Sequence, residues 1–494
     1  MGNSQSIAGR SCFLSALGNN TDLVTFRGDI LYEMRGLPSY NLAIPVLAIP
    51  VRPAVITYPE TTSQVAEIVR CAAESDYKVQ AYSGGHSYGN YGLGGADGHV
   101  VVDLKNFQHF AMDPDTHVAT IGAGTNLGTV QDRLLHAGAR AMTHGDCPQV
   151  GAGGHFTIGG LGMMARQWGT SLDHVVEAEV VLANSSVVTA SDTQNQDVFW
   201  AVKGAAASFG IVTQFKVRTQ AILKAALQYT YLFSQGGVMD RVQLFLDWQT
   251  LISKPNLTHD FSSQLTIFQD GILIMSSFFG TEQEFQQFQR ENDLPFQSMG
   301  NVAYIANWLS LIAHTAEDYL LQIFGGLFTS FYAKSVSFPA DQLFDVHVLV
   351  AFFTYLDSAP KGTQTWFIIF DLEGGAVNDV HMNATAYAHR DAIMWMQSYV
   401  VVGYDDPPSF IAKRFLNRLH DLVLANRPPG PVRSYPGYVD PFMKDGQTAY
   451  WGTNLPRLQD IKTRVDPKDM FHNPQSVRVN PPNSSVVRRA WWSL

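Results

Sequence analysis

Two glycine-rich stretches of the chain each carry one side chain that can act as a nucleophile. The first is AYSGGHSYGNYGLGG, residues 81–95, with His86 at its centre, and the second is HGDCPQVGAGGHFTIGGLGMMARQWG, residues 144–169, with Cys147. Glycines remove Cβ atoms, so consecutive backbone N–H groups of such loops can converge on an anion, typically a phosphate. A neutral imidazole and a thiolate are both good nucleophiles, and we expect amide dipoles and nearby histidines such as His144 to activate the cysteine.

The same residues also fit plainer roles. A histidine in a turn is commonly an ordinary hydrogen-bonding residue, and a single cysteine is commonly an inert small hydrophobe. Neither loop has the Lys-Ser/Thr pair of a phosphate loop or a G-x-G-x-x-G fingerprint between a strand and a helix. Metal binding would use His86, His144, Cys147 and His155. These residues do not fall into a compact zinc spacing, and a metal would not need the glycines, so we predict no metal site.

The elements around the first loop are typical of an α/β domain. Residues 54–82 read as a strand, an amphipathic helix that begins near Thr61 and Gln64, and a second strand that leads into the His86 loop. Loops at strand ends are a usual place for ligand contacts. The patterns then predict strands at 99–104 and 117–124, a helix at 126–140, a hairpin at 177–191 and a helix, turn and strand over 197–219.

A second domain is predicted beyond residue 220, where the glycine-rich loops stop. Strands are expected near 226–234, 263–279 and 364–373, and the RPPGP stretch at 427–431 marks a boundary. The remaining tail has turn chemistry and one predicted helix.

Composition excludes several classes of protein. The 494 residues are 46% hydrophobic and carry a formal net charge of -10, with no basic stripe that could neutralise a nucleic acid backbone. No run of 18 apolar residues predicts a transmembrane helix. We therefore expect a globular, monomeric protein that acts on small molecules and has no nucleic acid partner.

The signals for localisation conflict. A disulfide between Cys12 and Cys71 is possible, and five N-x-S/T sequons at Asn19, Asn184, Asn256, Asn383 and Asn483 also favour an oxidising, secretory compartment. The first residues do not read as a signal peptide, and the M-G-x-x-x-S pattern offers Gly2 for myristoylation. We favour a cytoplasmic protein, with secretion as the alternative.

The segments SGGHSYGNYGLGG and HGDCPQVGAGGHFTIGGLG together resemble the paired flavinylation loops of the vanillyl-alcohol oxidase / p-cresol methylhydroxylase (PCMH-type) superfamily. Within it, they are similar to the berberine-bridge-enzyme-like branch and the fungal oligosaccharide oxidases. The resemblance implies an α+β fold, with a PCMH-type FAD-binding domain of two α/β subdomains and a substrate domain built on an antiparallel sheet covered by helices. The implied divisions are an N-terminal segment 1–47, the FAD domain 48–220, the substrate domain 221–425, a returning C-terminal segment 426–480 and a tail 481–494.

The resemblance implies FAD bound by two covalent bonds, from His86 to the flavin 8α-methyl carbon and from Cys147 to flavin C6. The other cofactor-binding residues that it implies are Ser83, Gly84, Gly85, Ser87, Val150, Gly151, Gly154, His155, Gly159, Gly160, Gly162, Ile211, Val212 and Asn473. Val150 stands where the family controls access of O₂, and a small residue there is similar to the oxidases.

The implied reaction is oxidation of an alcohol by hydride transfer to flavin N5, followed by reoxidation with O₂ and release of H₂O₂. In SYPGYVDP, residues 434–441, Tyr438 matches the family's general base and Tyr435 a substrate contact. Asp371, three residues before the Gly-Gly pair of FDLEGGAVNDV, matches the acid that assists the base. Tyr88 and Gln397 match further substrate contacts.

The sequence leaves three functions open. Ile369 departs from the polar residue that oligosaccharide oxidases often have two positions before the acid, which favours an oxidase of fungal secondary metabolism acting on a polyketide-like or other aromatic alcohol. The Tyr-x-x-Tyr, Asp371 and Gln397 matches favour a secreted oligosaccharide oxidase that forms a lactone. The third is a non-catalytic flavin-binding protein.

Overall fold

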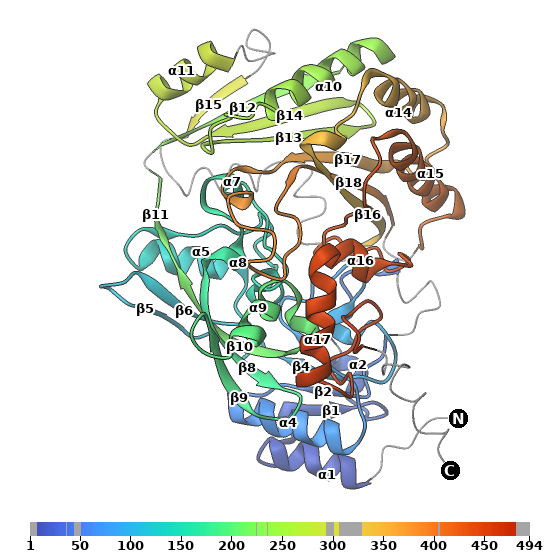
Figure 1. Ribbon diagram of the computed structural model, residues 1–494. Helices are drawn as coiled ribbons and strands as arrows, with labels where there is room; N and C mark the ends of the chain where they lie inside the picture. Colours follow the sequence, from blue (N-terminus) through green and yellow to red (C-terminus); the bar gives the residue numbers. More distant parts are fainter. Residues whose placement is uncertain are drawn as a thin grey trace, which may run out of the picture.

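The computed structural model describes residues 7–35, 37–43, 51–223, 225–234, 236–292, 301–305, 329–403 and 406–480. The acylation motif at Gly2, the sequon at Asn483 and the expected tail 481–494 lie outside these residues. The described chain forms three main sheets, two in the N-terminal half and one in the C-terminal half (Figure 1). The expected α+β fold is confirmed.

The first sheet has four strands in the order β1-β2-β4-β3. Three of them are parallel: β2 (Val55–Thr57), β4 (Val100–Asp103) and β3 (Val79–Tyr82), whereas β1 (Val24–Phe26) joins β2 antiparallel. The predicted strand, helix and strand are present as β2, α4 (Thr62–Glu74) and β3, and the Thr61 hydroxyl accepts the N–H of Gln64 at 3.3 Å. The His86 loop follows β3, as predicted.

The second sheet is antiparallel, in the order β5-β6-β10-β8-β9. Its strands are β5 (Phe110–Met112), β6 (Val118–Gly122), β10 (Gly210–Arg218), β8 (Val175–Leu182) and β9 (Val187–Ser191). The helices α5 (Leu127–His136) and α9 (Gln196–Ala205) accompany it. The short helical turns α6 (Ala152–His155) and α7 (Ala165–Trp168) lie within the Cys147 loop, and α8 (Ser171–His174) follows it. One continuous apolar core joins these two sheets.

The third sheet has seven antiparallel strands in the order β15-β12-β14-β13-β17-β18-β16. The strands are β12 (Ala226–Phe233), β13 (Phe261–Phe268), β14 (Gly271–Phe278), β15 (Asn301–Ile305), β16 (Ser330–Pro339), β17 (Thr365–Leu372) and β18 (Ala392–Val402). The range 263–279, expected as a strand, holds the two strands of a hairpin, because the turn Gln269–Asp270 reverses the chain between Phe268 and Gly271. Gly271, the first residue of β14, has a φ of 153°.

The helices α10 (Val238–Ile252), α14 (Val346–Ser358) and α15 (Phe410–Asn426) cover one face of this sheet, and α11 (Glu282–Asn292) packs at its β14 end. In Figure 1 these helices lie on the side turned away from the first two sheets. The opposite face of the sheet therefore looks toward the two glycine loops. This arrangement agrees with the expected antiparallel sheet covered by helices.

The C-terminal segment returns to the first half of the molecule. It has two helices rather than the one expected, α16 (Gly446–Trp451) and α17 (Leu455–Val465), which lie beside the N-terminal sheets in Figure 1. The ammonium group of Lys462 is fully buried and donates to the carbonyl oxygens of Ser208 and Phe471 at 2.6 and 2.9 Å. The bond to Ser208, in the turn that precedes β10, attaches the segment to the second sheet. Phe471, itself part of the segment, forms a bridge with Val79 at the edge of the first sheet.

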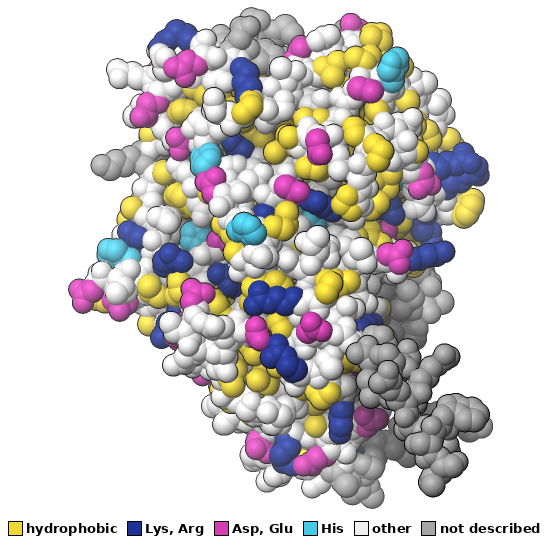
Figure 2. Space-filling view, viewed as in Figure 1, with side chains coloured by type: hydrophobic (Ala, Val, Ile, Leu, Met, Phe, Trp, Pro, Cys, Tyr) yellow, Lys and Arg dark blue, Asp and Glu magenta, His cyan; other side chains and the backbone are white. Residues whose placement is uncertain are grey.

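On the face shown in Figure 2, acidic and basic side chains are interspersed. Among the described helices, none is long and apolar enough to span a bilayer.

A disulfide joins Cys12 on α1 (Ile7–Ala16) to Cys71 on α4, which answers the question that the sequence left open. The bond closes a loop with a sequence separation of 59 residues. By the chain-entropy model, such a cross-link stabilises the folded state by up to about 4 kcal/mol. We expect the Cys12→Ala/Cys71→Ala variant to melt at a lower temperature than the parent protein in non-reducing thermal scans, and dithiothreitol to lower the melting temperature of the parent alone. Equal melting temperatures for parent and variant would contradict a stabilising role.

Candidate active site

The two glycine loops lie in direct contact, backbone against backbone. A Cβ added to Gly84 would overlap the backbone nitrogen of Gly151, and a Cβ added to Gly151 would overlap the backbone nitrogen of Gly84. No side chain fits at either position. His86 comes two residues after one of these glycines and Cys147 four residues before the other, so the contact brings the two reactive side chains into the same region.

His86 is partly buried, and its ring lies 4.5 Å from that of Tyr40, measured between centroids. Burial lowers the pKa of His86 to about 4, so the imidazole is neutral near pH 7 and keeps a free electron pair for bond formation. The predicted nucleophile therefore has the required charge state.

The expected activation of Cys147 by neighbouring histidines is wrong. Burial, with a smaller effect from Asp146, raises the pKa of the Cys147 thiol to about 11. The His144 Nδ1 donates to the Gly145 carbonyl at 2.8 Å, and the Gly145 N–H donates to His155 Nε2 at 2.9 Å. Burial lowers the pKa of both histidines, so neither supplies a positive charge to the thiol. The cysteine is a neutral thiol in this environment.

Several other residues of the predicted cofactor set make contacts within the protein. Gly159, Gly160 and Gly162 let their loop pack closely against Tyr435, Ser171 and the His144 carbonyl. Hydrogen bonds join Ser83 to Ala123, Ser87 to Tyr91, and Asn473 to both Ser476 and Gln475. Ile211 and Val212 are buried in β10. Gly85 has a φ of 76°, in the left-handed region that favours glycine. Gly154 differs, because no atom lies within 4 Å of an added Cβ, which leaves open space beside the second loop.

The loop-facing side of the seven-stranded sheet carries the other half of the candidate site. Alternate residues of a strand share a face, so Asp371, Ile369 and Phe367 of β17 point the same way. The register pairs Asp371 with Gln264 of β13, Ile369 with Gln397 of β18, and Phe367 with Tyr399 of β18. The face thus changes from polar at the Asp371 end to aromatic at the Phe367 end.

Asp371 is held by two amide groups. Gln264 Nε2 donates to its Oδ1 at 2.7 Å, and Gln397 Nε2 donates to its Oδ2. Loss of hydration raises the pKa of Asp371, and the two hydrogen bonds oppose that rise because they stabilise the charged carboxylate. No hydrogen bond between Asp371 and Tyr438 is present among the described residues, so the predicted partnership of these two residues is not a direct contact.

Tyr435 and Tyr438 pack edge to face, with ring centroids 4.9 Å apart, but occupy different environments. Tyr435 is 3% exposed, and its hydroxyl accepts the Gly160 N–H at 2.8 Å, which attaches the C-terminal segment to the Cys147 loop. Tyr438 is partly buried, and its ring lies 6.0 Å from that of Tyr88. Burial, and then the charge of Asp371, raise the pKa of Tyr438.

An aromatic cluster surrounds the approach from His86 to the sheet. The Tyr88 ring lies 4.9 Å from Phe331 of β16 and 6.1 Å from Tyr399, and the Phe367 and Tyr399 rings are stacked at 4.6 Å. Tyr40 completes this group. The structure therefore brings together His86, Cys147, Tyr88, Asp371, Gln397 and Tyr438 at the junction of the two halves of the chain.

Comparisons with known proteins decide the family. A model of the "FAD binding domain" matches residues 53–191, and one described as "Berberine and berberine like" matches residues 434–478. The FAD-linked oxidoreductase sorD of Penicillium rubens is 36% identical and spans 94% of this chain and 98% of its own. The chitooligosaccharide oxidase of Gibberella zeae is 31% identical and spans 89% of each chain. The chain belongs to the berberine-bridge-enzyme-like family of FAD-linked oxidases.

As a member of this family, the chain is an FAD-dependent oxidoreductase, which confirms that prediction. The structure of glucooligosaccharide oxidase from Acremonium strictum aligns with a TM-score of 0.84 and 28% identity, covering 96% of this chain and 100% of that one. That protein carries a 6-S-cysteinyl, 8α-N1-histidyl FAD. In this FAD-linked oxidase, a histidine and a cysteine on touching loops, with open space beside Gly154, fit the same cofactor.

Three residues of the FAD-linked oxidase site have no counterpart in the sequence-based predictions. They are Gln264, Tyr399 and Tyr40, which contact Asp371, Gln397 and His86 respectively. Gln264 and Tyr399 lie on strands, at alternate positions with other members of the site face. That alternation is the signal that could have revealed them, had the pairing of the strands been known.

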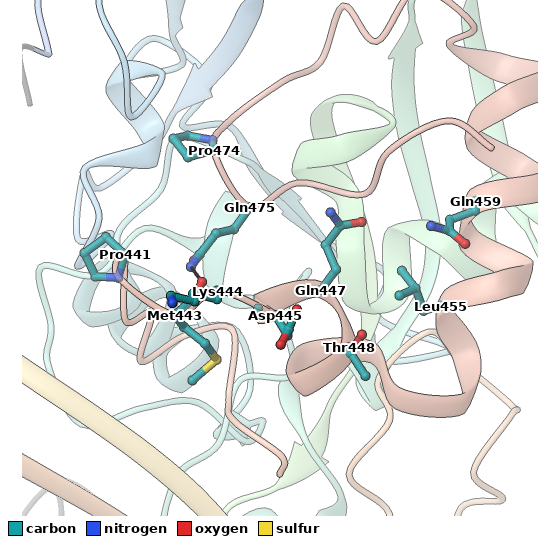
Figure 3. A pocket seen from close by; sticks show the side chains of 11 residues that line it. Pro441, Met443, Lys444, Asp445, Gln447, Thr448, Leu455, Gln459, Pro474 and Gln475 are labelled. Atoms are coloured by element: carbon teal, nitrogen blue, oxygen red, sulfur yellow. Dashed lines mark hydrogen bonds between the residues drawn. The ribbon is translucent and has the colours of Figure 1, made fainter. Parts of the chain in front are cut away.

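A separate pocket of roughly 340 Å³ lies in the C-terminal segment and is drawn in Figure 3. Its lining includes Lys444, Gln447, Gln459 and Gln475, and it contains none of the predicted site residues. Among the described residues, no group of three or more histidine, cysteine or acidic side chains is placed to hold a metal.

Proposed function

We propose that this protein is a bicovalent FAD oxidase of an apolar, aromatic alcohol, such as a polyketide-like intermediate of fungal secondary metabolism. The observation that carries the choice of substrate is the aromatic face beside His86. In this proposal residues 48–220 hold FAD, residues 221–425 receive the substrate and residues 426–480 supply the base. The active unit is a monomer.

His86 and Cys147 are the proposed attachment points for the flavin. His86 is neutral and can form a bond without first losing a proton, because burial keeps its pKa near 4. The Cys147 thiol, with its pKa raised to about 11, has to lose its proton as its bond forms. Each new bond would replace a C–H bond of the flavin, so each attachment would release two electrons and two protons, which O₂ would take up as H₂O₂. FAD, when bound, supplies a two-electron acceptor for the hydride of the alcohol and passes the electrons to O₂. Val150, whose N–H donates to the Cys147 carbonyl at 3.2 Å, is the proposed control point for O₂.

Tyr438 is the proposed base that removes the hydroxyl proton of the substrate. The carbon atom of the alcohol loses a hydride and its oxygen loses a proton, so the product is a carbonyl compound and the reduced O₂ leaves as H₂O₂. The raised pKa of Tyr438 opposes a free phenolate, so the phenol has to pass its own proton on as it accepts the new one. The Asp371 carboxylate, whose charge contributes to the raised pKa of Tyr438, is the proposed final acceptor. Because the two side chains share no hydrogen bond, a water molecule between them has to carry the proton in this proposal.

The residues of the substrate face favour a substrate molecule with an apolar body and one hydroxyl group. Ile369 and Tyr88 are the partly exposed members of this face, and they lie on a buried layer that includes Phe367 and Phe331. The surface that a ligand would meet here is therefore apolar, and the Tyr88 ring can stack on an aromatic ligand. Each oxygen of Asp371 and both ends of the Gln397 amide already have partners within the protein. These groups are therefore less available to the several hydroxyl groups of a sugar.

An oligosaccharide oxidase is the second candidate function. It is supported by the polar end of the face, where Gln264, Asp371 and Gln397 stand side by side, and by the likeness to the chitooligosaccharide and glucooligosaccharide oxidases.

The test is to measure H₂O₂ release from a panel of aromatic alcohols and of cello-, xylo- and chito-oligosaccharides at matched concentrations. We expect kcat/KM for the best aromatic alcohol to exceed that for the best sugar by at least about a hundredfold, which corresponds to about 2.7 kcal/mol of preferential transition-state binding. Faster turnover of a sugar would assign the second function. Failure of every electron donor to bleach the flavin absorbance would indicate a non-catalytic flavin-binding protein.

A further inference from the structure

A chain of hydrogen bonds runs across the site face from the His86 loop to Asp371. The hydroxyl oxygens of Tyr88 and Tyr399 are 3.0 Å apart, and the Tyr399 hydroxyl donates to Gln397 Oε1 at 2.7 Å. Gln397 Nε2 donates to Asp371 Oδ2. A hydroxyl group can donate only one hydrogen bond, and that of Tyr399 goes to Gln397. Tyr399 must therefore accept its second hydrogen bond from the Tyr88 hydroxyl.

Asp371 sets the direction of this chain, and Tyr399 holds the Gln397 amide in that direction from the other end. A carboxylate can only accept hydrogen bonds, so the Gln397 amide has to present its nitrogen to Asp371 and its oxygen to Tyr399. Without a donor on the oxygen side, the amide is free to turn and the bond to Asp371 weakens. Gln264 acts from the opposite side, where its nitrogen donates to Asp371 Oδ1 at 2.7 Å and its oxygen accepts from Thr266 at 3.4 Å.

The charged groups around Asp371 do not take the place of the hydrogen bonds from Gln397 and Gln264. Glu373, at the end of β17, is 5% exposed, and the charge of Asp371 contributes to the raised pKa of Glu373. Tyr399 on β18 and Tyr438 from the C-terminal segment also face the Asp371 charge. The nearby guanidinium groups, Arg166 and Arg390, act on Glu373, and β13 contributes the uncharged Gln264. The two amides are the only hydrogen-bond donors to the Asp371 carboxylate among the described side chains.

We infer that Tyr399 is a positioning residue, whose hydroxyl orients the Gln397 amide toward Asp371 and so keeps this carboxylate ionised and ready to accept a proton. The inference rests on the proposed function, in which Asp371 is the final proton acceptor. Tyr399 itself has no place in the transfer of the proton. The same bond keeps the Gln397 oxygen engaged with the protein instead of the substrate.

The variant Tyr399→Phe removes the hydroxyl and keeps the ring. Because the carboxylate loses part of its stabilisation, the pKa of Asp371 rises. The acid side of the kcat/KM profile therefore moves to higher pH by about one unit, which is about a tenfold change in proton affinity. Gln264→Leu removes a direct donor and is expected to move the acid side at least as far.

Tyr332→Phe is the matched control. Tyr332 lies on β16 with its ring in the core on the opposite face of the same sheet, and its hydroxyl donates to Asn417 at 2.8 Å. This variant loses that bond and the one that the hydroxyl accepts from the Lys334 ammonium group at 3.3 Å, without touching the chain to Asp371. We expect its pH profile to match that of the parent.

The ionisation of Asp371 can also be read without turnover. Infrared titration of the carboxyl C=O band, assigned by its loss in Asp371→Asn, gives the midpoint directly in parent and variants. A higher midpoint in Tyr399→Phe supports the inference even if the protein oxidises no alcohol. The absence of alcohol oxidation would contradict only the proposed function. Equal midpoints in parent and Tyr399→Phe, with a raised midpoint in Gln264→Leu, would overturn the inference and leave the proposed function standing.

Discussion

Replacing Tyr438 by phenylalanine is expected to slow reduction of the bound flavin by the alcohol by about 10²- to 10⁴-fold, the usual contribution of a general base. The ring stays in place against Tyr88 and Tyr435, so packing is kept and only the proton acceptor is lost. Stopped-flow absorbance under anaerobic conditions measures the reduction step by itself. Flavin content per polypeptide should equal that of the parent.

Tyr435→Phe is the matched control for this experiment. Its hydroxyl accepts the Gly160 N–H, so its removal leaves a buried donor unpaired at a cost of about 1 to 3 kcal/mol. We expect a lower melting temperature and a reduction rate within about tenfold of the parent. If Tyr435→Phe lost the reduction step and Tyr438→Phe kept it, the assignment of the base would have to be exchanged between the two tyrosines.

The second large effect concerns attachment of the flavin. In the variant His86→Ala/Cys147→Ala, flavin fluorescence on a denaturing gel should disappear from the protein band, while either single variant should keep it. Each single variant retains one covalent bond, whereas the double variant holds the cofactor by noncovalent contacts that denaturation breaks. Intact mass measured on each protein reports the same result as the presence or absence of the FAD increment.

His144→Ala serves as the control, because His144 bonds to the Gly145 carbonyl and does not activate the thiol. It should keep the full FAD increment and remain fluorescent when combined with His86→Ala. Loss of attachment in that combination would show that the Cys147 bond depends on His144 after all. Fluorescence that stayed on the double variant would place a covalent bond at another residue.

The parts of the fold that the sequence predicts are those set by local patterns. The helix α4 begins where Thr61 caps it, and its apolar residues Val65, Ile68 and Val69 face the core at helical spacing. The β8–β9 hairpin and β10 follow from runs of alternating or continuous apolar residues between turn signals. The glycine loops are likewise visible in the sequence, because a close backbone contact requires glycine.

The parts that the sequence does not predict depend on pairing over long distances. The sequence of β18 is an apolar run without alternation, because most of its residues are buried. In the first sheet, β4 lies between β2 and β3 although it comes after both in the chain. Gln264 reaches Asp371 across 107 positions, a pairing fixed only by the register of β13 and β17. The charge state of Cys147 likewise depends on burial, which the sequence around it does not reveal.

The contact between Gly84 and Gly151 has a consequence for the order of events during maturation. The two loops are fixed to one another by their own backbones, so the spacing between the proposed attachment points exists before any cofactor arrives. Once the first bond to the flavin has formed, the second reaction takes place within a single molecule, at the high effective molarity of a preorganised pair. Singly attached protein should therefore be a short-lived species in the parent and should accumulate when an alanine at either glycine separates the loops.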